Sequence, residues 1–350
     1  MITFEAVRKQ FPDGTVAVEH LDLELPAGRT TVFVGPSGCG KTTSLRMVNR
    51  MVEPTGGRVL LDGRDVREQD AAALRRGIGY VIQHAGLFPH RTVVDNVLTV
   101  PRLLGRRRQR AAAIELLERV GLPAAFADRY PAQLSGGQQQ RVGVARALAA
   151  DPPVLLMDEP FSAVDPVVRG QLQQEFLRLQ AELGKTIVLV THDIDEAVVL
   201  GDRIAVFRQG GHLAQVGTPR ELLTRPADAF VRDFVGRDRG YRGLSFEGTE
   251  GLRVRPLDEA GGPVLLLDAA GRPLGWEGAG VPAGAAGPPG TFGPGDSLRT
   301  VLDLALTSPV GVAVRVDGTG RATGLAHHRD VVEVLEQRRA LPAASGGPLA

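Results

Sequence analysis

Glycines, a lysine and two threonines stand together in "GPSGCGKTT", after an apolar run and before a helical pattern. The spacing Gly-x-x-x-x-Gly-Lys-Thr is typical of a phosphate-binding loop, in which backbone N–H groups and a helix N-terminus converge on phosphate oxygens. Lys41 is expected to reach the β- and γ-phosphates, Thr42 to bind Mg²⁺, and Cys39 to be small filler in a variable position. We expect this phosphate loop to bind ATP through Gly35, Pro36, Ser37, Gly38, Cys39, Gly40, Lys41, Thr42 and Thr43.

A pair of acids follows a second apolar run, "PVLLMDEP". Asp158 is placed to hold Mg²⁺, and Glu159 to polarise an attacking water as general base. Gln83, after "GYVI", can reach Mg²⁺ and the water, and His192, after "TIVLVT", can contact the γ-phosphate. Taken alone, the acid pair could be two solvated residues at a strand end, and a single Gln or His at a strand end is more often a capping group than a catalytic one. The hypothesis gains from their shared position after strands of one sheet, where α/β proteins bind ligands.

A second glycine-rich stretch, "LSGGQQQR" (Leu134–Arg141), has no lysine and precedes a helical pattern. Ser135, Gly136, Gly137 and Gln138 therefore form a candidate second anion cradle. Phe11, before Pro12, is a candidate for stacking on the adenine ring, and an ordinary core phenylalanine is the alternative.

The elements that must position these residues alternate short apolar runs with longer helical patterns up to Gly236. Nearly continuous apolar runs favour strands covered on both faces by helices, as in a parallel α/β sheet. The expected strands cover residues 30–35, 79–83, 153–160, 186–193 and 203–210. A helical subdomain is expected over about residues 89–150. We therefore predict one α/β domain over residues 1–236.

Residues 237–350 have a different texture and are predicted to form a separate α+β module. "VLLLDAAGRPLG" and "VAVRVDGTGRATG" share Asp-x-x-Gly-Arg-x-x-Gly, which indicates a repeated strand, tight turn and strand. The Gly- and Pro-rich segment 275–296 between them is expected to be a flexible linker. Helical patterns flank only the second copy, so the repeat is partly degenerate.

Composition narrows the classes of function. The formal net charge of +1 gives no overall field for nucleic acid, and the single cysteine excludes a disulfide framework. No apolar stretch is long enough to cross a bilayer, and the charged first residues do not resemble a secretory signal. We expect a protein that serves a membrane, if at all, through a partner.

The chain contains, in this order, the phosphate loop, Gln83, "LSGGQ", "VLLMDEP", "SAVD" and "THD". With these motifs, residues 1 to about 225 resemble the ATP-binding subunit of an ABC transporter. The resemblance implies a P-loop cassette with a RecA-like core sheet and a helical subdomain, and hydrolysis of ATP with Mg²⁺. It also implies a head-to-tail homodimer in which Ser135 to Gln138 of one chain face the γ-phosphate bound by Lys41 of the other. Val164 stands where the family usually has leucine, and Phe11 where it commonly has tyrosine.

The segments "MVNRMVEPTGGRVLLDG" and "IGYVIQHAGLFPHRTVVDNV" are similar to ATPases that import glycine betaine, choline, carnitine or proline betaine. This likeness implies membrane-embedded permease subunits, an extracytoplasmic solute-binding protein, and a place at the cytoplasmic face of the membrane. "HAGLFPH" (His84–His90) would receive the permease. The tail resembles a cystathionine-β-synthase-type (CBS) module, in which Asp330 matches a ribose-binding aspartate but His327 stands where Thr or Ser is usual. Another importer solute, such as an amino acid or sulfonate, a non-transport ABC ATPase and a non-catalytic regulator are the alternatives.

Overall fold

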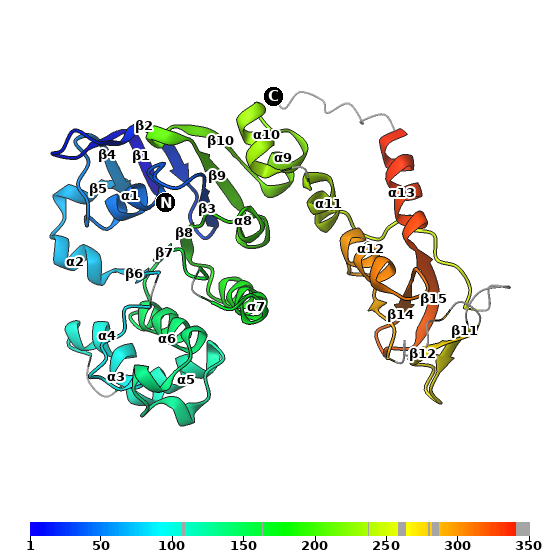
Figure 1. The fold of residues 1–350 in the computed structure, drawn as a ribbon. Coiled ribbons are helices and arrows are strands. Elements are labelled where there is room, and N and C mark those ends of the chain that lie inside the picture. The colour runs from blue at the N-terminus through cyan, green and yellow to red at the C-terminus, as the bar shows by residue number, and fades with distance from the viewer. Residues whose placement is uncertain are drawn as a thin grey trace. The chain divides into compact units, whose positions relative to one another are not determined.

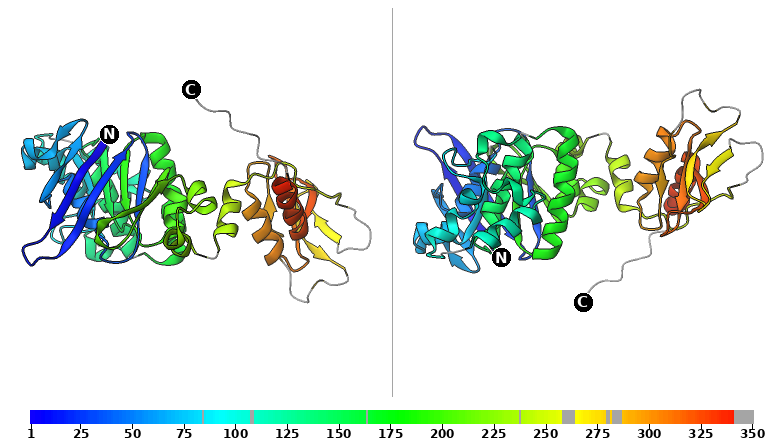
Figure 2. Two further views of the ribbon diagram at one scale, coloured as in Figure 1. Left: turned by 90° about the horizontal axis from the view of Figure 1, so that it is seen from above. Right: turned by 90° about the horizontal axis from the view of Figure 1, so that it is seen from below.

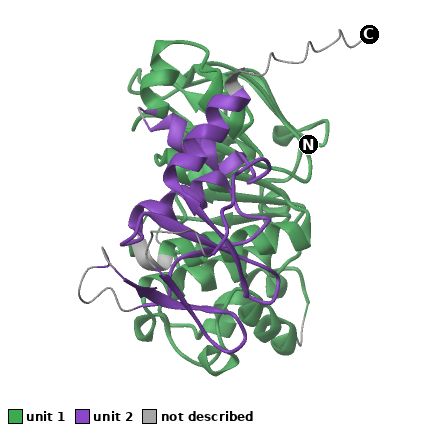
Figure 3. Ribbon diagram, turned by 90° about the vertical axis from the view of Figure 1, so that its right-hand side faces the viewer, with its two compact units in different colours: residues 1–235 green, residues 236–350 purple. Residues whose placement is uncertain are grey.

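The computed structural model describes residues 1–83, 85–106, 109–162, 164–236, 238–257, 264–278, 281 and 287–340. The chain divides into two compact units, Met1–Val235 and Gly236–Ala350, coloured green and purple in Figure 3. No helix in the described part of the chain has the length and apolarity needed to cross a membrane.

The centre of unit 1 is a sheet whose described strands run in the order β10-β9-β3-β8-β7-β6 (Figure 1). Neighbouring strands are parallel, except that β10 is antiparallel to β9. The parallel sheet and the five strands predicted from apolar runs are thus confirmed. The strands are β3 (Thr30–Val34), β6 (Ile78–Val81), β7 (Val154–Asp158), β8 (Thr186–Val190), β9 (Arg203–Phe207) and β10 (Leu213–Gly217).

Each central strand contributes alternate side chains to two different hydrophobic clusters. Val32 and Val34 pack in the cluster that includes the helical subdomain, whereas Phe33 packs in the cluster that includes α1 (Lys41–Val48). Both faces of the sheet are therefore covered. This is why the strands read as continuous apolar runs instead of alternating ones.

A second, antiparallel sheet belongs to the same unit, and its long strands lie side by side in Figure 2. Its strand order is β2 (Val16–Leu25), β1 (Ile2–Gln10), β4 (Gly56–Leu61) and β5 (Arg64–Asp65). The sequence pattern did not predict this sheet. The apolar alternation of β1 is interrupted where the register shifts between Phe4 and Val7, and Ala6 there has a positive φ of 46°.

Short helices occupy the segment predicted as a helical subdomain, drawn in cyan to green in Figure 1. They are α3 (Val93–Val97), α4 (Thr99–Leu103), α5 (Arg110–Arg119) and α6 (Gly136–Leu148), with 3-10 turns at Ala124–Phe126 and Pro131–Gln133. The other helices described in unit 1 are α2 (Ala71–Arg76), α7 (Pro166–Leu183), α8 (Ile194–Leu200), α9 (Pro219–Thr224) and α10 (Ala229–Val235), with 3-10 turns at Val66–Glu68 and Gln209–Gly211.

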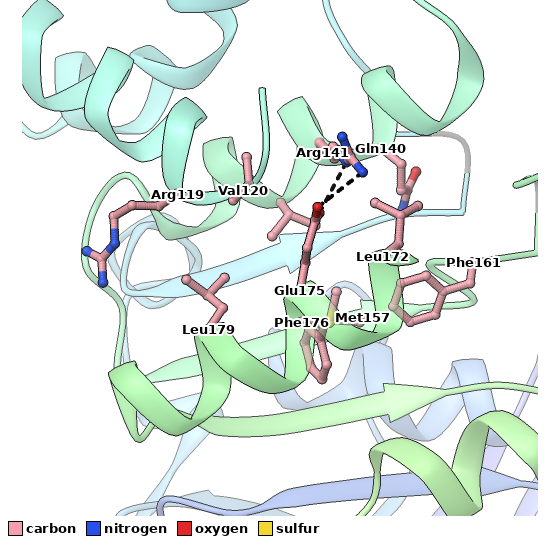
Figure 4. Close-up of a pocket in the computed structure, with 11 residues that line it drawn as sticks. Arg119, Val120, Gln140, Arg141, Met157, Phe161, Leu172, Glu175, Phe176 and Leu179 are labelled. Carbon is pink, nitrogen blue, oxygen red and sulfur yellow. Dashed lines mark hydrogen bonds and ion pairs between the residues drawn. The ribbon is translucent and has the colours of Figure 1, made fainter. Parts of the chain in front are cut away.

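A small cavity of about 30 Å³ lies where α6 meets α7, with Met157 of β7 in its lining (Figure 4). Arg141 of α6 and Glu175 of α7 form an ion pair beside it, with 3.3 Å between Arg141 Nε and Glu175 Oε2. Gln140 also lines the cavity, and its buried Nε2 has no hydrogen-bond partner among the described residues. The junction between helical subdomain and core is thus held by charge as well as by apolar packing.

Unit 2 contains both predicted strand–turn–strand repeats. The first is the antiparallel pair β11 (Val264–Leu267) and β12 (Pro273–Glu277); the second is β14 (Val312–Val316) and β15 (Ala322–His327). Asp268 and Asp317 organise the two turns in the same way, because each accepts hydrogen bonds from the backbone N–H groups two and four residues later. The helices are α11 (Arg239–Gly243), α12 (Leu298–Thr307) and α13 (His328–Ala340), with a 3-10 turn at Leu244–Phe246.

The predicted linker over residues 275–296 is wrong at both ends. Its first residues belong to β12, and β13 (Thr291–Phe292) pairs in parallel with β14. Trp276 and Phe292 are 7% and 1% exposed, so burial of these aromatic rings outweighs the surrounding glycines and prolines. Residues 279–280 and 282–286 of the predicted linker lie outside the described residues.

Candidate nucleotide-binding site

The phosphate loop connects β3 to α1 and depends on glycine at positions where the backbone is tightly packed. Gly35 and Gly40 have positive φ angles of 150° and 97°. A Cβ added at Gly35 would lie 2.4 Å from the Phe207 carbonyl oxygen, and one at Gly40 would lie 2.3 Å from that of Ala17. Only glycine fits such positions without displacing the neighbouring strands.

Lys41 is the first residue of α1 and is only 6% exposed. Its Nζ donates to the carbonyl oxygens of Gly35 at 2.8 Å and of Pro36 at 2.9 Å, so the ammonium group lies inside the curve of its own loop. Gln209 supports the loop from outside by donating to the Ser37 carbonyl at 3.1 Å. Burial raises the pKa of the Cys39 thiol, which fits a packing role rather than a reactive one.

Asp158, at the end of β7, joins α1 through both of its carboxylate oxygens. Thr42 Oγ1 donates to Oδ1 at 2.8 Å, and Arg46 Nη2 donates to Oδ2 at 3.3 Å. Thr42 and Arg46 are one helical turn apart, so both side chains project from the same face of α1. The carboxylate is nearly buried, because its side chain is 9% exposed.

Glu159 follows directly and receives two other predicted site residues at a single oxygen. Its Oε2 accepts from Gln83 Nε2 at 3.4 Å and lies 3.1 Å from His192 Nδ1. Its backbone φ of 47° lies in the left-handed region that side chains other than glycine rarely adopt. Strain of this kind is frequent in functional sites, where it directs a side chain that the regular strand would turn away.

The structure thus brings together residues from the ends of four elements. Thr42 of α1 contacts Asp158 at the end of β7, and Gln83 after β6 and His192 after β8 contact Glu159, the next residue along the chain. Lys41 precedes Thr42, so all of these residues lie at or next to the carboxyl edge of the sheet. The remaining predicted residues lie elsewhere. Phe11 is in the connection from β1 to β2, half-buried, with Lys9 Nζ 5.0 Å from its ring centroid.

Ser135 to Gln138 form the start of α6. Ser135 is the N-cap, its Oγ accepts from Gln138 N at 3.3 Å, and its N–H donates to Gln138 Oε1 at 2.9 Å. Gly136 and Gly137 are the first two helical residues. Within the described residues, no hydrogen bond or ion pair joins this segment to the phosphate loop of the same chain.

Arg46 and Gln209 are contacts that sequence reasoning did not find. Arg46 had a usable signal, because it follows Thr42 by one turn in a helix that was itself predicted. Gln209 had none, since its contact with Ser37 requires β9 to lie beside β3, which only the fold shows.

A phosphate loop on a parallel sheet, a helical subdomain and the Asp158–Glu159 pair define an ATP-binding cassette. Residues 18–162 match the family model described as ABC transporter. The chain is 43% identical to the osmoprotectant import ATP-binding protein OsmV of Salmonella typhimurium (strain LT2) over 97% of each chain. This chain therefore belongs to the ABC transporter family.

The glycine betaine/carnitine/choline transport ATP-binding protein OpuCA of Bacillus subtilis (strain 168) is 52% identical, over 68% of this chain and 63% of OpuCA. The chain thus spans just under two thirds of OpuCA. The solved dimeric structure of MJ0796, a bacterial ABC transporter cassette, is 36% identical with a TM-score of 0.57. The structural match covers 63% of this chain and 99% of MJ0796.

Proposed function

We propose that this chain is the ATP-hydrolysing subunit of an ABC importer for quaternary-amine osmoprotectants such as glycine betaine, choline, carnitine or proline betaine. The convergence of Thr42, Asp158 and Glu159 beside the phosphate loop carries the ATPase part of the proposal. The solute class rests on the relatives OpuCA and OsmV, whose names state transport of glycine betaine, carnitine and choline, and import of osmoprotectants, respectively. An importer for another solute or a non-transport ABC ATPase would share the site but differ in partners.

ATP with Mg²⁺ is the proposed ligand. Lys41 would bind the β- and γ-phosphates, and Phe11 would stack on the adenine ring. The oxygens of Thr42 and Asp158 lie 2.8 Å apart. The amide oxygen of Gln83, whose Nε2 donates to Glu159, is the third proposed ligand. Mg²⁺ suits this set because it prefers oxygen ligands and binds through one or two protein groups together with substrate phosphates. When bound, it would neutralise charge on the phosphates.

Glu159 is proposed as the general base for the attacking water. Gln83 and His192 both contact its Oε2, which fixes the carboxylate and leaves Oε1 to accept the proton of that water. Among the described residues, no group of three His, Cys, Asp or Glu side chains could hold a metal. The proposed cation would therefore need ligands from the nucleotide.

The active form is proposed to be a head-to-tail homodimer. Ser135 and the backbone at the start of α6 would face the γ-phosphate held by Lys41 of a second copy, where the helix dipole favours negative charge. The dimeric structure of the MJ0796 cassette supports the formation of a dimer. We place the dimer at the cytoplasmic face of the membrane, in contact with permease subunits. An extracytoplasmic solute-binding protein would deliver the solute to these permease subunits. The permease would contact residues 84–90, of which His84 lies outside the described residues.

Unit 2 is proposed to be a degenerate CBS-like module with a structural role. The order β13, α12, β14, β15, α13 agrees with one such module. The side chain of Asp330, the proposed counterpart of a ribose ligand, is 0% exposed and pairs with Arg255 at 2.9 Å. Its other oxygen accepts from the His327 N–H at 2.8 Å. The structural role is supported by this burial and by the pairing of the carboxylate within the unit.

Glu159→Gln tests the proposed ATPase. The amide cannot take a proton, so steady-state hydrolysis by the full chain should fall by about 10²- to 10⁴-fold. Binding of a fluorescent ATP analogue should be retained, and ATP should produce a lasting dimer in size-exclusion chromatography. In the same background, Ser135→Arg should keep single-chain nucleotide binding but prevent that dimer.

Glu118→Gln, an exposed change on α5, is the matched control and should hydrolyse ATP normally. Near wild-type turnover in Glu159→Gln would remove that residue from its proposed role. The solute is tested separately, by transport of radiolabelled quaternary amines into vesicles that carry the reconstituted importer. No uptake of any of them would reject the solute class while leaving the ATPase intact.

A further inference from the structure

Arg46 holds the second oxygen of Asp158, and nothing in the proposed catalytic cycle uses this contact. The Nη2 to Oδ2 distance is 3.3 Å, and the arginine side chain is 45% exposed. The first oxygen of the same carboxylate is already oriented by Thr42. The guanidinium therefore adds little to the aim of the carboxylate, and its main contribution is a positive charge.

No other described charge competes for this position. Tyr80 of β6 lies beside the guanidinium, but burial raises the pKa of its hydroxyl, so it is neutral at pH 7. Asp158 is thus the anionic partner of Arg46, and Arg46 is the cation that faces the proposed metal-binding carboxylate.

A fixed positive charge beside a metal ligand weakens cation binding, because the guanidinium and the divalent cation share one carboxylate and repel each other. We infer that the charge of Arg46 sets the affinity of the site for divalent cations, because the guanidinium stays paired with Asp158 until the nucleotide delivers its metal. This inference rests on the proposed function, since it requires a nucleotide-dependent cation at Thr42 and Asp158.

The test is a titration of Mn²⁺ into the full chain with saturating ADP, followed by electron paramagnetic resonance. Arg46→Gln keeps a hydrogen-bond donor and removes the charge, so the Mn²⁺ affinity should rise by about threefold to tenfold. Arg46→Lys keeps the charge and should stay within about twofold of the wild type. Arg110→Gln, which breaks an exposed ion pair with Asp128 in the helical subdomain, is the control and should change nothing.

Binding of fluorescent ADP in the presence of a chelator separates the possible causes. Arg46 has no contact with the phosphate loop among its described hydrogen bonds, so metal-free ADP affinity should be the same in all variants. Equal or weaker Mn²⁺ binding in Arg46→Gln would overturn the inference, as would a matching loss of metal-free ADP affinity. A lower melting temperature with unchanged Mn²⁺ affinity would assign Arg46 a purely structural role. Failure of the wild type to bind any nucleotide would instead reject the proposed function.

Discussion

At the scale of single residues, two glycines of the phosphate loop differ in why a side chain is unfavourable. At one only the backbone conformation disfavours it, and at the other a steric clash is added. Gly38 and Gly40 both have positive φ, at 76° and 97°. An added Cβ at Gly38 meets nothing within 4 Å, whereas one at Gly40 lies 2.3 Å from the Ala17 carbonyl oxygen. Gly38→Ala should therefore cost about 1–2 kcal/mol of unfolding free energy, from the left-handed backbone alone.

Gly40→Ala has the same backbone strain and, in addition, a clash between the new Cβ and the Ala17 carbonyl oxygen. Either α1 or β2 must move to relieve this clash. We expect it to cost more than about 3 kcal/mol and to weaken ATP binding, because α1 carries Lys41 and Thr42. Urea unfolding and ATP titration of both variants measure the difference. Equal losses in the two variants would show that the loop relaxes freely around Gly40.

Motif spacing predicted Lys41, Thr42 and the Asp158–Glu159 pair, because each stands at a fixed distance from a recognisable strand or helix start. It could not predict that Gln83 and His192 meet at one oxygen of Glu159. That contact depends on which strands flank β7, and the order of strands in a parallel sheet is not written in any local pattern. The positive φ of Glu159 was equally invisible.

At the scale of elements, two ion pairs that differ in burial join α7 to the helical subdomain, one to α6 and one to α5. Arg141 and Glu175 are 17% and 27% exposed beside the cavity of Figure 4, whereas Arg119 and Glu182 are 41% and 50% exposed. Glu175→Gln leaves a half-buried guanidinium without its counter-charge and should cost about 1–3 kcal/mol of unfolding free energy.

Glu182→Gln is the matched change on the same helix, and it should cost less than about 1 kcal/mol because water already screens its pair. Thermal and urea unfolding of the two variants give the comparison. If Glu182→Gln proves the more damaging, the burial argument fails. Since Ser135 is the N-cap of α6, Glu175→Gln should in addition slow the formation of the ATP-dependent dimer.

The predictability of elements followed their burial. Core strands such as β8 were found because both of their faces are apolar, whereas β1 was missed because a bulge breaks its alternation. The tail repeat was found from its turn residues, yet the segment between its copies was assigned as linker although Trp276 and Phe292 are buried. Local composition favoured a linker there, and long-range packing of two aromatic rings decided otherwise.

At the scale of the whole molecule, the two units can be followed separately in the intact chain. The sequence contains a single tryptophan, Trp276, which is buried in unit 2. Its fluorescence therefore reports on unit 2 alone, whereas nucleotide binding reports on unit 1. The contribution of the buried Asp330–Arg255 pair to the stability of unit 2 can therefore be measured in the intact chain.

Burial alone would raise the pKa of Asp330, but hydrogen bonds from Arg255 and the His327 N–H outweigh it and lower the pKa. A carboxyl whose pKa is lower in the folded state stabilises above its unfolded pKa of about 3.9, and this contribution is lost as the pH falls through the folded value. Asp330→Asn should therefore destabilise unit 2 by about 3 kcal/mol at pH 7, since it removes the buried counter-charge of Arg255. The difference in unfolding free energy between this variant and the wild type should narrow only below about pH 4.

Glu333→Gln, exposed on the same helix, should unfold like the wild type in the same fluorescence melts. A gap that already closes near neutral pH would mean that Asp330 is not the ionised partner of Arg255.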